Sequence, residues 1–244
     1  MVLRTDRWLR TLAWIALSLP TAPCLAASLQ VSPTQFELRP QQNAEALWIS
    51  NSGTQTVQVQ VRVFQWQQVD GRDTLTPTQA LLPSPPMQAL AAGQRQLVRL
   101  VRAEDGAPAT QQAYRVIVDE VPAYDPTRQG MQFVLRYSIP VVVQPVGKPP
   151  EPLLSARLLG TGTTQAQLEV SNRGQGQAQI ADLGLVVGDR RTPLMDGLVG
   201  YVLPGQTMRW PLQQPPAQLQ GGTFSARING GSEPLPLPAT PPAR

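Results

Sequence analysis

The chain repeats one order of strand and turn residues, and this repeat limits its fold more than any other feature of the sequence. The first copy is Ala46–Gly53 (ALWISNSG), followed by the alternating residues Thr56–Val63. The second copy is Ala166–Gly174 (AQLEVSNRG), followed by Ala178–Leu183. Each copy contains a strand, a Ser-Asn-x-Gly turn and another strand, and Asn and Gly tolerate the positive φ of a tight turn. We therefore expect a β-hairpin in each copy.

The order of elements continues in the same way in both halves. Glycine-containing turns follow at Leu90–Gln94 and Val202–Gln206, and each precedes another strand-like run, at Leu97–Leu100 and Met208–Trp210. Helical periodicity is nowhere sustained after residue 28. The sequence therefore predicts an all-β chain with two tandem immunoglobulin-like β-sandwich domains.

Short alternating runs between Pro, Gly and Asn clusters indicate the individual strands. In the first half of the chain we expect strands at residues 29–38, 45–50, 56–66, 96–102, 113–121 and 131–143. Residues 70–92 are expected to be mostly loop, because they contain the turn-forming Asp70–Asp73 and a proline-rich segment.

Residues 1–27 have the order of a secretory signal peptide. Three arginines among the first ten residues precede an apolar run, Leu12–Leu19, and small residues follow at Ala26–Ser28. The run is shorter than the ~20 apolar residues that a transmembrane helix needs. We expect export to the periplasm, cleavage next to residue 27 and no insertion into the membrane. A retained N-terminal anchor is the alternative.

Proline-rich segments divide the remaining chain. We expect the first domain at residues 28–145, a linker at 146–150 and the second domain at 151–235. Prolines stiffen the linker and hold the angle between the domains. Residues 236–244 form a proline-rich tail, which we expect not to pair in a sheet.

Residue types that carry much of enzyme chemistry are missing. The chain has no histidine, and its one cysteine, Cys24, lies in the expected signal peptide. This excludes Ser-His-Asp and Cys-His catalysis and the usual zinc and blue-copper sites. The net charge is +4 and no run of Lys and Arg is present, which argues against nucleic-acid binding. We expect a protein that is not an enzyme and binds no cofactor, metal or nucleic acid.

Residues 131–143 alternate over more positions than the five or six residues of a typical strand. Met131, Phe133 and Leu135 begin a row of large, mostly apolar side chains on one face, and Arg136 lies on the other face. Pro140 lacks an N–H group, which places the strand at or near a sheet edge. An apolar edge strand favours pairing with another chain. The alternative is that the whole row lies in the core of its own domain.

Four segments carry a resemblance to a known family: Leu90–Leu100, Tyr114–Pro122, Arg136–Val141 and Gly200–Gly205. Together they resemble the periplasmic pilus (fimbrial) chaperones of the PapD type, and Tyr-Ser-Ile-Pro-Val at 137–141 is most similar to their archaic, or sigma-type, branch. The resemblance covers nearly all of residues 28–235. It implies two immunoglobulin-like domains in an L or boomerang arrangement. It also implies a chaperone that folds and caps pilus subunits by donor-strand complementation and delivers them to an outer-membrane usher.

The resemblance also assigns roles to individual residues. It implies that Met131, Phe133 and Leu135 fill the groove of the subunit. Members of the classical branch grip the subunit's C-terminal carboxylate with an Arg and a Lys, and the alignment places Gln35 and Pro140 at these two positions. Either the carboxylate is held elsewhere or its anchoring is weaker here. Arg136 is a candidate substitute, its alternative role being a solvated charge that discourages aggregation.

The resemblance further implies that Arg99 and Glu120 form a structural ion pair in the first domain. Two other functions stay open: a structural pilus subunit or adhesin, and a secreted sandwich that binds a sugar or another ligand. The latter requires an aromatic platform, whereas Trp48, Trp66 and Trp210 lie in core-like patterns. Self-association through the donor edge is a further open alternative.

Overall fold

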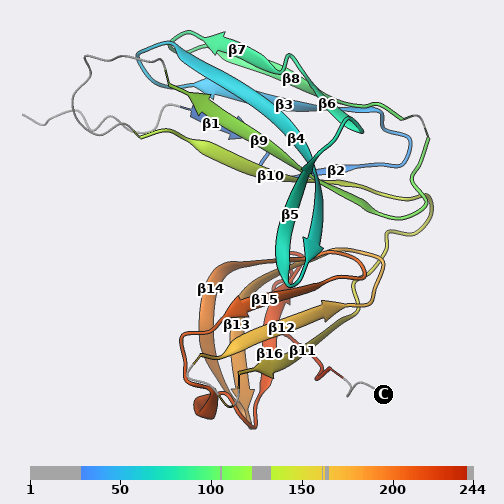
Figure 1. Ribbon diagram of the computed structural model, residues 1–244, viewed down its shortest axis with the longest axis vertical. Coiled ribbons are helices and arrows are strands. Elements are labelled where there is room, and N and C mark those ends of the chain that lie inside the picture. Colours follow the sequence, from blue (N-terminus) through green and yellow to red (C-terminus); the bar gives the residue numbers. More distant parts are fainter. Residues whose placement is uncertain (1–28, 105, 123–132, 161, 163–164, 241–244) are drawn as a thin grey trace, which may run out of the picture.

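The computed structural model describes residues 29–104, 106–122, 133–160, 162 and 165–240, which form two β-sandwiches (Figure 1). The predicted all-β fold with two tandem sandwich domains is confirmed. The segment assigned to a signal peptide, residues 1–27, lies outside the described residues. Within the described ranges, no helix is long and apolar enough to cross a membrane.

The first domain is a sandwich of a four-stranded sheet, in the order β1-β3-β8-β6, and a six-stranded sheet, in the order β2-β10-β9-β4-β5 with β7 also paired to β4. Its strands are β1 (Leu29–Ser32), β2 (Phe36–Leu38), β3 (Ala44–Asn51), β4 (Val57–Val69), β5 (Arg72–Pro77), β6 (Leu81–Ser84), β7 (Met87–Leu90), β8 (Arg95–Arg102), β9 (Gln112–Val121) and β10 (Arg136–Val143).

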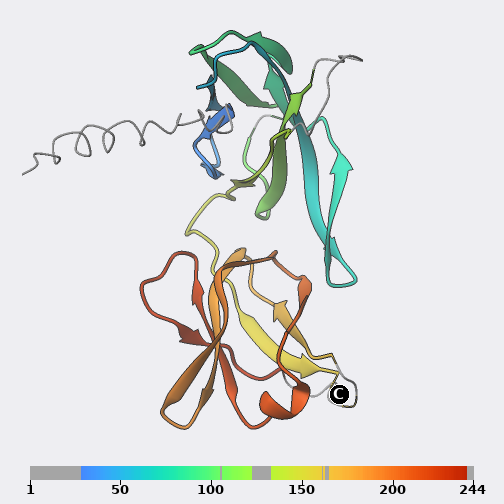
Figure 2. The ribbon, with the colours of Figure 1, turned by 90° about the vertical axis from the view of Figure 1, so that its left-hand side faces the viewer.

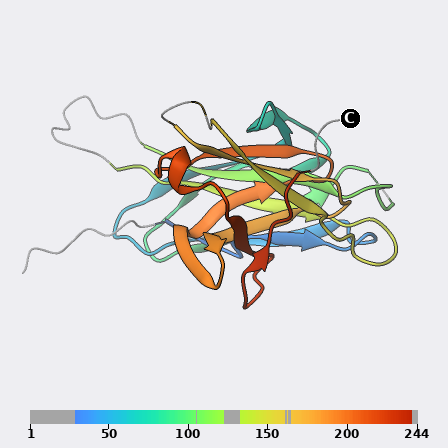
Figure 3. The ribbon, with the colours of Figure 1, turned by 90° about the horizontal axis from the view of Figure 1, so that it is seen from below.

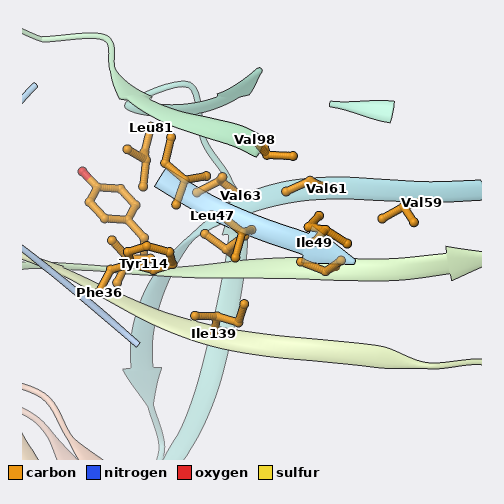
Figure 4. Close-up of a cluster of buried hydrophobic side chains, with 14 of the residues drawn as sticks. Phe36, Leu47, Ile49, Val59, Val61, Val63, Leu81, Val98, Tyr114 and Ile139 are labelled. Atoms are coloured by element: carbon orange, nitrogen blue, oxygen red, sulfur yellow. The ribbon is translucent and has the colours of Figure 1, made fainter. Parts of the chain in front are cut away.

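Alternating side chains from both sheets fill the space between them. Val59, Val61 and Val63 of β4 point inward and are buried, whereas the residues between them face outward. They meet Leu47 and Ile49 of β3 from the facing sheet (Figure 4). The period of two in the sequence therefore places one face of each sheet in the core.

The first strand of the domain is shared between the two sheets. β1 pairs antiparallel with β3, and after a cis peptide bond at Ser32–Pro33 the chain crosses over, so that β2 pairs in parallel with the end of β10. The single strand expected at 29–38 is therefore two short strands, and the six-stranded sheet gains an edge that covers only residues 141–143 of β10.

Residues 70–92 are not mostly loop, because β5, β6 and β7 all lie within them. The side chains of β5 are mainly exposed and show no apolar period. Backbone pairing with the last six residues of β4, from Phe64–Pro77 to Val69–Arg72, forms this hairpin instead. Such a strand cannot be predicted from hydrophobic alternation.

The predicted hairpins at the two Ser-Asn-x-Gly turns are wrong, because the strands on either side belong to different sheets. In the first domain, Asn51 is buried, and its side-chain amide donates to the carbonyls of Gln55 and Leu90 at 2.7 and 3.0 Å. Its side-chain oxygen accepts the backbone N–H of Gly53 at 2.9 Å. The turn is thus a crossover between sheets, held by a buried asparagine rather than by positive φ angles.

The second domain repeats this arrangement. Its sheets have the orders β11-β12-β15 and β14-β13-β16-β17. Asn172 donates to the carbonyls of Gly176 and Val202 at 2.8 and 3.1 Å, matching the bonds of Asn51. The elements are β11 (Leu154–Leu159), β12 (Gln167–Asn172), β13 (Ala178–Val187), β14 (Arg190–Val202), β15 (Thr207–Pro211), the 3-10 turn η1 (Pro216–Gln218), β16 (Thr223–Ile228) and β17 (Leu235–Pro236).

The C-terminal tail pairs with both sheets of the second domain, contrary to the expectation for residues 236–244. The N–H of Leu237 donates to Phe224 in β16 at 2.8 Å. Ala156 in β11 donates to Pro238 at 2.7 Å and accepts from Thr240 at 2.9 Å. Prolines are tolerated because the segment lies along sheet edges, where one side of the backbone needs no partner. The tail therefore closes an open side of the sandwich and buries Leu237.

Each domain also places one carboxylate between two arginines on neighbouring strands. Glu169 of β12 accepts hydrogen bonds from Arg157 at 2.5 Å and from Arg209 at 2.7 Å. Asp119 of β9 does the same with Arg62, at 2.6 Å, and with Arg136. Burial alone raises the pKa of both carboxyls, but the hydrogen bonds and charges of the arginines outweigh it and lower each pKa.

The ion pair expected between Arg99 and Glu120 is not formed. Arg99 is exposed on the outer face of β8, whereas Glu120 lies on β9 in the facing sheet. Glu120 instead accepts the backbone N–H of Leu135 at 3.3 Å. Among the described residues of this domain, Asp119 is the carboxylate that binds arginines.

The hairpin of β4 and β5 connects the two domains. It extends from the first sandwich to the second, as Figures 1 and 2 show from two sides, and Figure 3 views the second sandwich from below. At its tip Gly71 forms a parallel bridge with Met208, and its carbonyl accepts the N–H of Arg209 at 3.2 Å. A Cβ atom at Gly71, where φ is +77°, would lie 2.8 Å from Cγ of Arg209. Only glycine therefore fits this contact without strain.

We predict that Leu237→Ala lowers the free energy of unfolding by about 2–5 kcal/mol, because it removes a buried side chain that the tail inserts under the sheet edges. Urea denaturation measures this change. Leu235→Ala, which alters an exposed residue of the same segment, is the control and should change stability by less than ~0.5 kcal/mol. Equal effects of the two substitutions would contradict the docked tail.

We predict that Glu169→Gln destabilises the protein by about 1–3 kcal/mol at pH 7. Because the folded pKa of Glu169 is lowered, its contribution is present above the unfolded value of about 4.3 and is lost as the pH falls through the folded pKa. The variant should therefore lose less stability than the wild type between neutral and acidic pH. Urea denaturation across this range tests the prediction, with the exposed Glu233→Gln as the control.

Candidate functional site

One side of the first sandwich is open along the beginning of β10. All of β10 pairs with β9, from Arg136–Asp119 to Val143–Gln112. On its other side, β2 pairs only with residues 141–143, so no strand of the described chain pairs with residues 136–140 there. Pro140 ends this free segment, in agreement with an edge position. The backbone of 136–140 can therefore receive a further strand.

Core side chains reach the surface along this open side. Leu135 and Tyr137 of the β10 segment and Val31 of β1 are partly buried and pack against the hydrophobic core. The hydroxyl of Tyr137 donates to the carbonyl of Leu29 at 2.6 Å, which joins the edges of the two sheets. The open edge is thus lined with apolar groups, and the Tyr137 hydrogen bond links the two sheets there.

The residues before β10 are placed differently from the expected strand at 131–143, because β10 begins only at Arg136. Phe133 and Val134 are 83% and 51% exposed. The carbonyl of Leu135 accepts the N–H of Glu120 at 2.9 Å, which aligns this segment with the end of β9. Met131 lies outside the described residues. Phe133 therefore presents a large apolar side chain to solvent beside the open edge.

Arg136 does not reach the cleft between the domains. Its side chain is largely exposed and pairs with Asp119, which Arg62 also binds. It is not among the residues that line the cavity between the domains. The arrangement fits a charge on the outer face of the sheet and gives no support to Arg136 as a substitute carboxylate anchor.

A cavity of about 440 Å³ lies between the two domains. Gln35 and Pro140, the two positions implied by the family resemblance, both line it, together with Arg115. The second domain contributes Gln179, Leu198, Val199, Gly200, Tyr201, Met208 and Trp210. The two positions implied by the resemblance therefore lie at one cavity, to which Arg115 brings a positive charge and Asp73 a negative charge.

Arg115 is half-buried, and no carboxylate of the described chain lies within ion-pair distance of it. Its guanidinium carbon lies 3.7 Å from the centroid of the Trp66 ring, and its closest hydrogen-bond acceptor is the carbonyl of Ser138 at 3.5 Å. Burial lowers the pKa of Arg115, partly offset by the charge of Asp73. The guanidinium is thus a half-buried positive group on the wall of the cavity, and Asp73 on the same wall partly balances its charge.

Reasoning from the sequence alone missed Arg115. The residue lies in the segment Tyr114–Pro122, between Tyr114 and Val116, and the same segment also contains the charged Asp119 and Glu120. That pattern is compatible with any solvated outward side chain, so it carried no signal of its own. Its place in the cleft depends on how the second domain docks.

Comparison with known proteins agrees with this geometry. Residues 28–149 match the family described as "Pili and flagellar-assembly chaperone, PapD N-terminal domain". No match is found among curated protein sequences.

Solved structures show the same fold across both domains. The CsuC–CsuE chaperone–tip adhesion subunit pre-assembly complex from archaic chaperone-usher Csu pili of Acinetobacter baumannii matches with a TM-score of 0.72 and 23% identity, over 88% of this chain and 100% of that chain. The YadV chaperone matches with a TM-score of 0.60 and 18% identity, over 86% and 98% of the two chains. The Salmonella enterica SafA pilin–SafB chaperone complex matches with a TM-score of 0.59 and 20% identity, over 86% and 94%.

The family match includes all of the first sandwich with its open β10 edge, and it spans half of the sequence. The chain therefore belongs to the pili and flagellar-assembly chaperones that carry a PapD N-terminal domain.

Proposed function

We propose that this protein is a periplasmic chaperone that caps pilus subunits by donor-strand complementation and delivers them to an outer-membrane usher. The observation that carries the proposal is the open edge of β10, where residues 136–140 have no partner strand of the described chain on the side away from β9 and apolar side chains line the gap. Two structures with the same fold contain a subunit, a tip adhesion subunit in one and a pilin in the other. The signal-like N-terminal sequence supports a periplasmic location.

The proposed complex uses backbone and side-chain contacts together. An added strand at 136–140 gains main-chain hydrogen bonds, and alternate side chains at 133, 135 and, by sequence alternation, 131 enter pockets of the subunit. Burying a side chain such as Phe133 contributes roughly 1.5–3 kcal/mol, and part of this is offset by the ordering of both chains. The contacts suffice for capture and permit later release.

The cleft supplies the second part of the proposed site. A strand of the pilus subunit that pairs with β10 and runs toward Pro140 brings its end to the cavity that contains Arg115. A chain-terminal carboxylate there would accept two N–H groups of the half-buried guanidinium and balance its charge. We therefore assign to Arg115 the anchoring of the terminal carboxylate of the bound pilus protein.

The other functions have less support. Trp66 is buried between the domains. The sequence predicts a core position for Trp48, but it is 37% exposed. The guanidinium carbon of Arg95 lies 4.1 Å from the centroid of the Trp48 ring and covers it. Trp66 and Trp48 do not form an aromatic platform for a sugar. A pilus subunit of the same system would itself need a donated strand, whereas here β10 is available for donation.

We predict that Phe133→Asp abolishes co-purification with a pilin that is co-expressed in the periplasm, because it places a charge in an apolar groove of the pilin. The matched control is Val134→Asp, whose side chain is also exposed and which falls on the other face by the alternation of the sequence. Both variants should unfold within ~0.5 kcal/mol of the wild type. Retention of the pilin by Phe133→Asp, or its loss in both variants, would show that the donor face is assigned wrongly.

We predict that Arg115→Gln weakens binding of the pilus subunit about 10- to 100-fold, the effect of losing a charged hydrogen bond. Arg115→Lys should recover only part of the affinity, because an ammonium group lacks the planar fork. Arg136→Gln tests the rival anchor and should have a much smaller effect. Isothermal titration with a synthetic peptide of the pilin's last strand measures all three. If Arg136→Gln weakened binding more than Arg115→Gln did, Arg136 and not Arg115 would be the anchor of the carboxylate.

A further inference from the structure

Arg115 contacts two aromatic rings and forms no ion pair among the described residues, although Asp73 lines the same cavity and its charge acts on the guanidinium. Its guanidinium carbon lies 3.7 Å from the centroid of Trp66 and 5.1 Å from that of Tyr201. The two rings meet edge to face, with centroids 5.3 Å apart and an angle of 81° between their planes. Such rings attract a cation through their faces and do not use its N–H groups. One of these groups donates to the carbonyl of Ser138 at 3.5 Å. The rings therefore orient the guanidinium while its other N–H groups can bind a ligand.

The two rings come from different domains. Trp66 belongs to β4 of the first domain, and its indole N–H donates to Asp73 at 2.9 Å. Tyr201 belongs to β14 of the second domain, and its hydroxyl accepts a hydrogen bond from Gln179 at 3.1 Å. Both rings are buried, and with Ala113 and Leu203 they form a separate apolar cluster between the domains.

A buried glutamine fixes the position of Tyr201 relative to the first domain. The side-chain amide of Gln68 donates to the backbone carbonyl of Tyr201 at 2.9 Å. Its side-chain oxygen accepts the backbone N–H of Leu203 at 2.9 Å. The backbone of β14 is thereby attached to β4, so the Tyr201 ring stands beside Arg115 only while the two domains are docked.

We propose that Tyr201 is a positioning residue of the carboxylate anchor: its ring, with that of Trp66, holds the Arg115 guanidinium in the cleft, so that the anchor is complete only when the second domain is docked. The inference rests on the proposed function of Arg115. It gives the second domain a direct part in recognising the terminal carboxylate of the bound pilus protein. It also couples binding of the carboxylate to docking of the two domains. If docking strengthens binding of the carboxylate by some factor, binding must favour docking by the same factor.

The test compares a short synthetic peptide of alternating valine and threonine with a free C-terminal carboxylate and the same peptide with a C-terminal amide. Binding to the full chain is measured by titration, and the readout is the ratio of the two affinities. Tyr201→Leu should lower the acid-over-amide ratio about five- to thirty-fold and leave the amide affinity unchanged. Tyr201→Phe retains an aromatic face and should stay within about twofold of the wild type.

A second measurement uses phenylalanine with increasing numbers of ring fluorines at position 201. Fluorine withdraws charge from the ring face with little change in shape, so the acid-over-amide ratio should fall stepwise along the series. A purely structural role of the ring would leave the ratio constant. The fluorine series tests the role of the ring at position 201 even if Tyr201→Leu does not fold.

The outcomes separate the two proposals. If the wild type does not distinguish acid from amide, the Arg115 anchor is wrong and the role of Tyr201 falls with it. If the wild type distinguishes them and Arg115→Gln does not, the anchor is correct. In that case a constant ratio in Tyr201→Leu or along the fluorine series overturns the role of Tyr201 alone.

Discussion

A buried asparagine amide closes each sandwich, and the remaining architecture depends on it. Asn51 and Asn172 each accept the N–H of the glycine two residues later and donate to carbonyls of two separate turns. These bonds satisfy the backbone at the place where the chain leaves one sheet for the other. Without them, polar groups would be buried without partners, at a cost of about 1–3 kcal/mol each. The same solution in both domains explains the repeat that is visible in the sequence.

The two closed sandwiches differ in whether their sheet edges are covered. In the second domain the C-terminal segment pairs with β16 and β11, so its proline-rich sequence covers two sheet edges. In the first domain β2 covers only the end of β10 and leaves residues 136–140 with one free side. An exposed apolar edge favours association with other chains. One edge is thus protected within the molecule, while the other stays available to a partner.

The cleft combines groups that neither domain holds alone. Arg115 and Trp66 come from the first domain and Tyr201 from the second. Gly71 and Gln68 of the β4–β5 hairpin attach the second domain in the orientation that brings these groups together. The hairpin therefore acts on the site through domain placement. A short linker with prolines would by itself restrict the angle, but it would not specify which residues meet.

The sequence by itself determined the two-sandwich fold and the core faces of the strands, because alternation with a period of two reports which side of a strand is buried. The donor face that includes Phe133 and Leu135 stays a prediction of that alternation. The sequence did not reveal β5 or the pairing of the tail, since these segments are held by backbone hydrogen bonds that side-chain patterns do not report. It also misassigned the Asn51 turn and the Arg99–Glu120 ion pair. Tertiary structure alone decided these features and the position of Arg115, because contacts between sheets and between domains join residues that are distant in the chain.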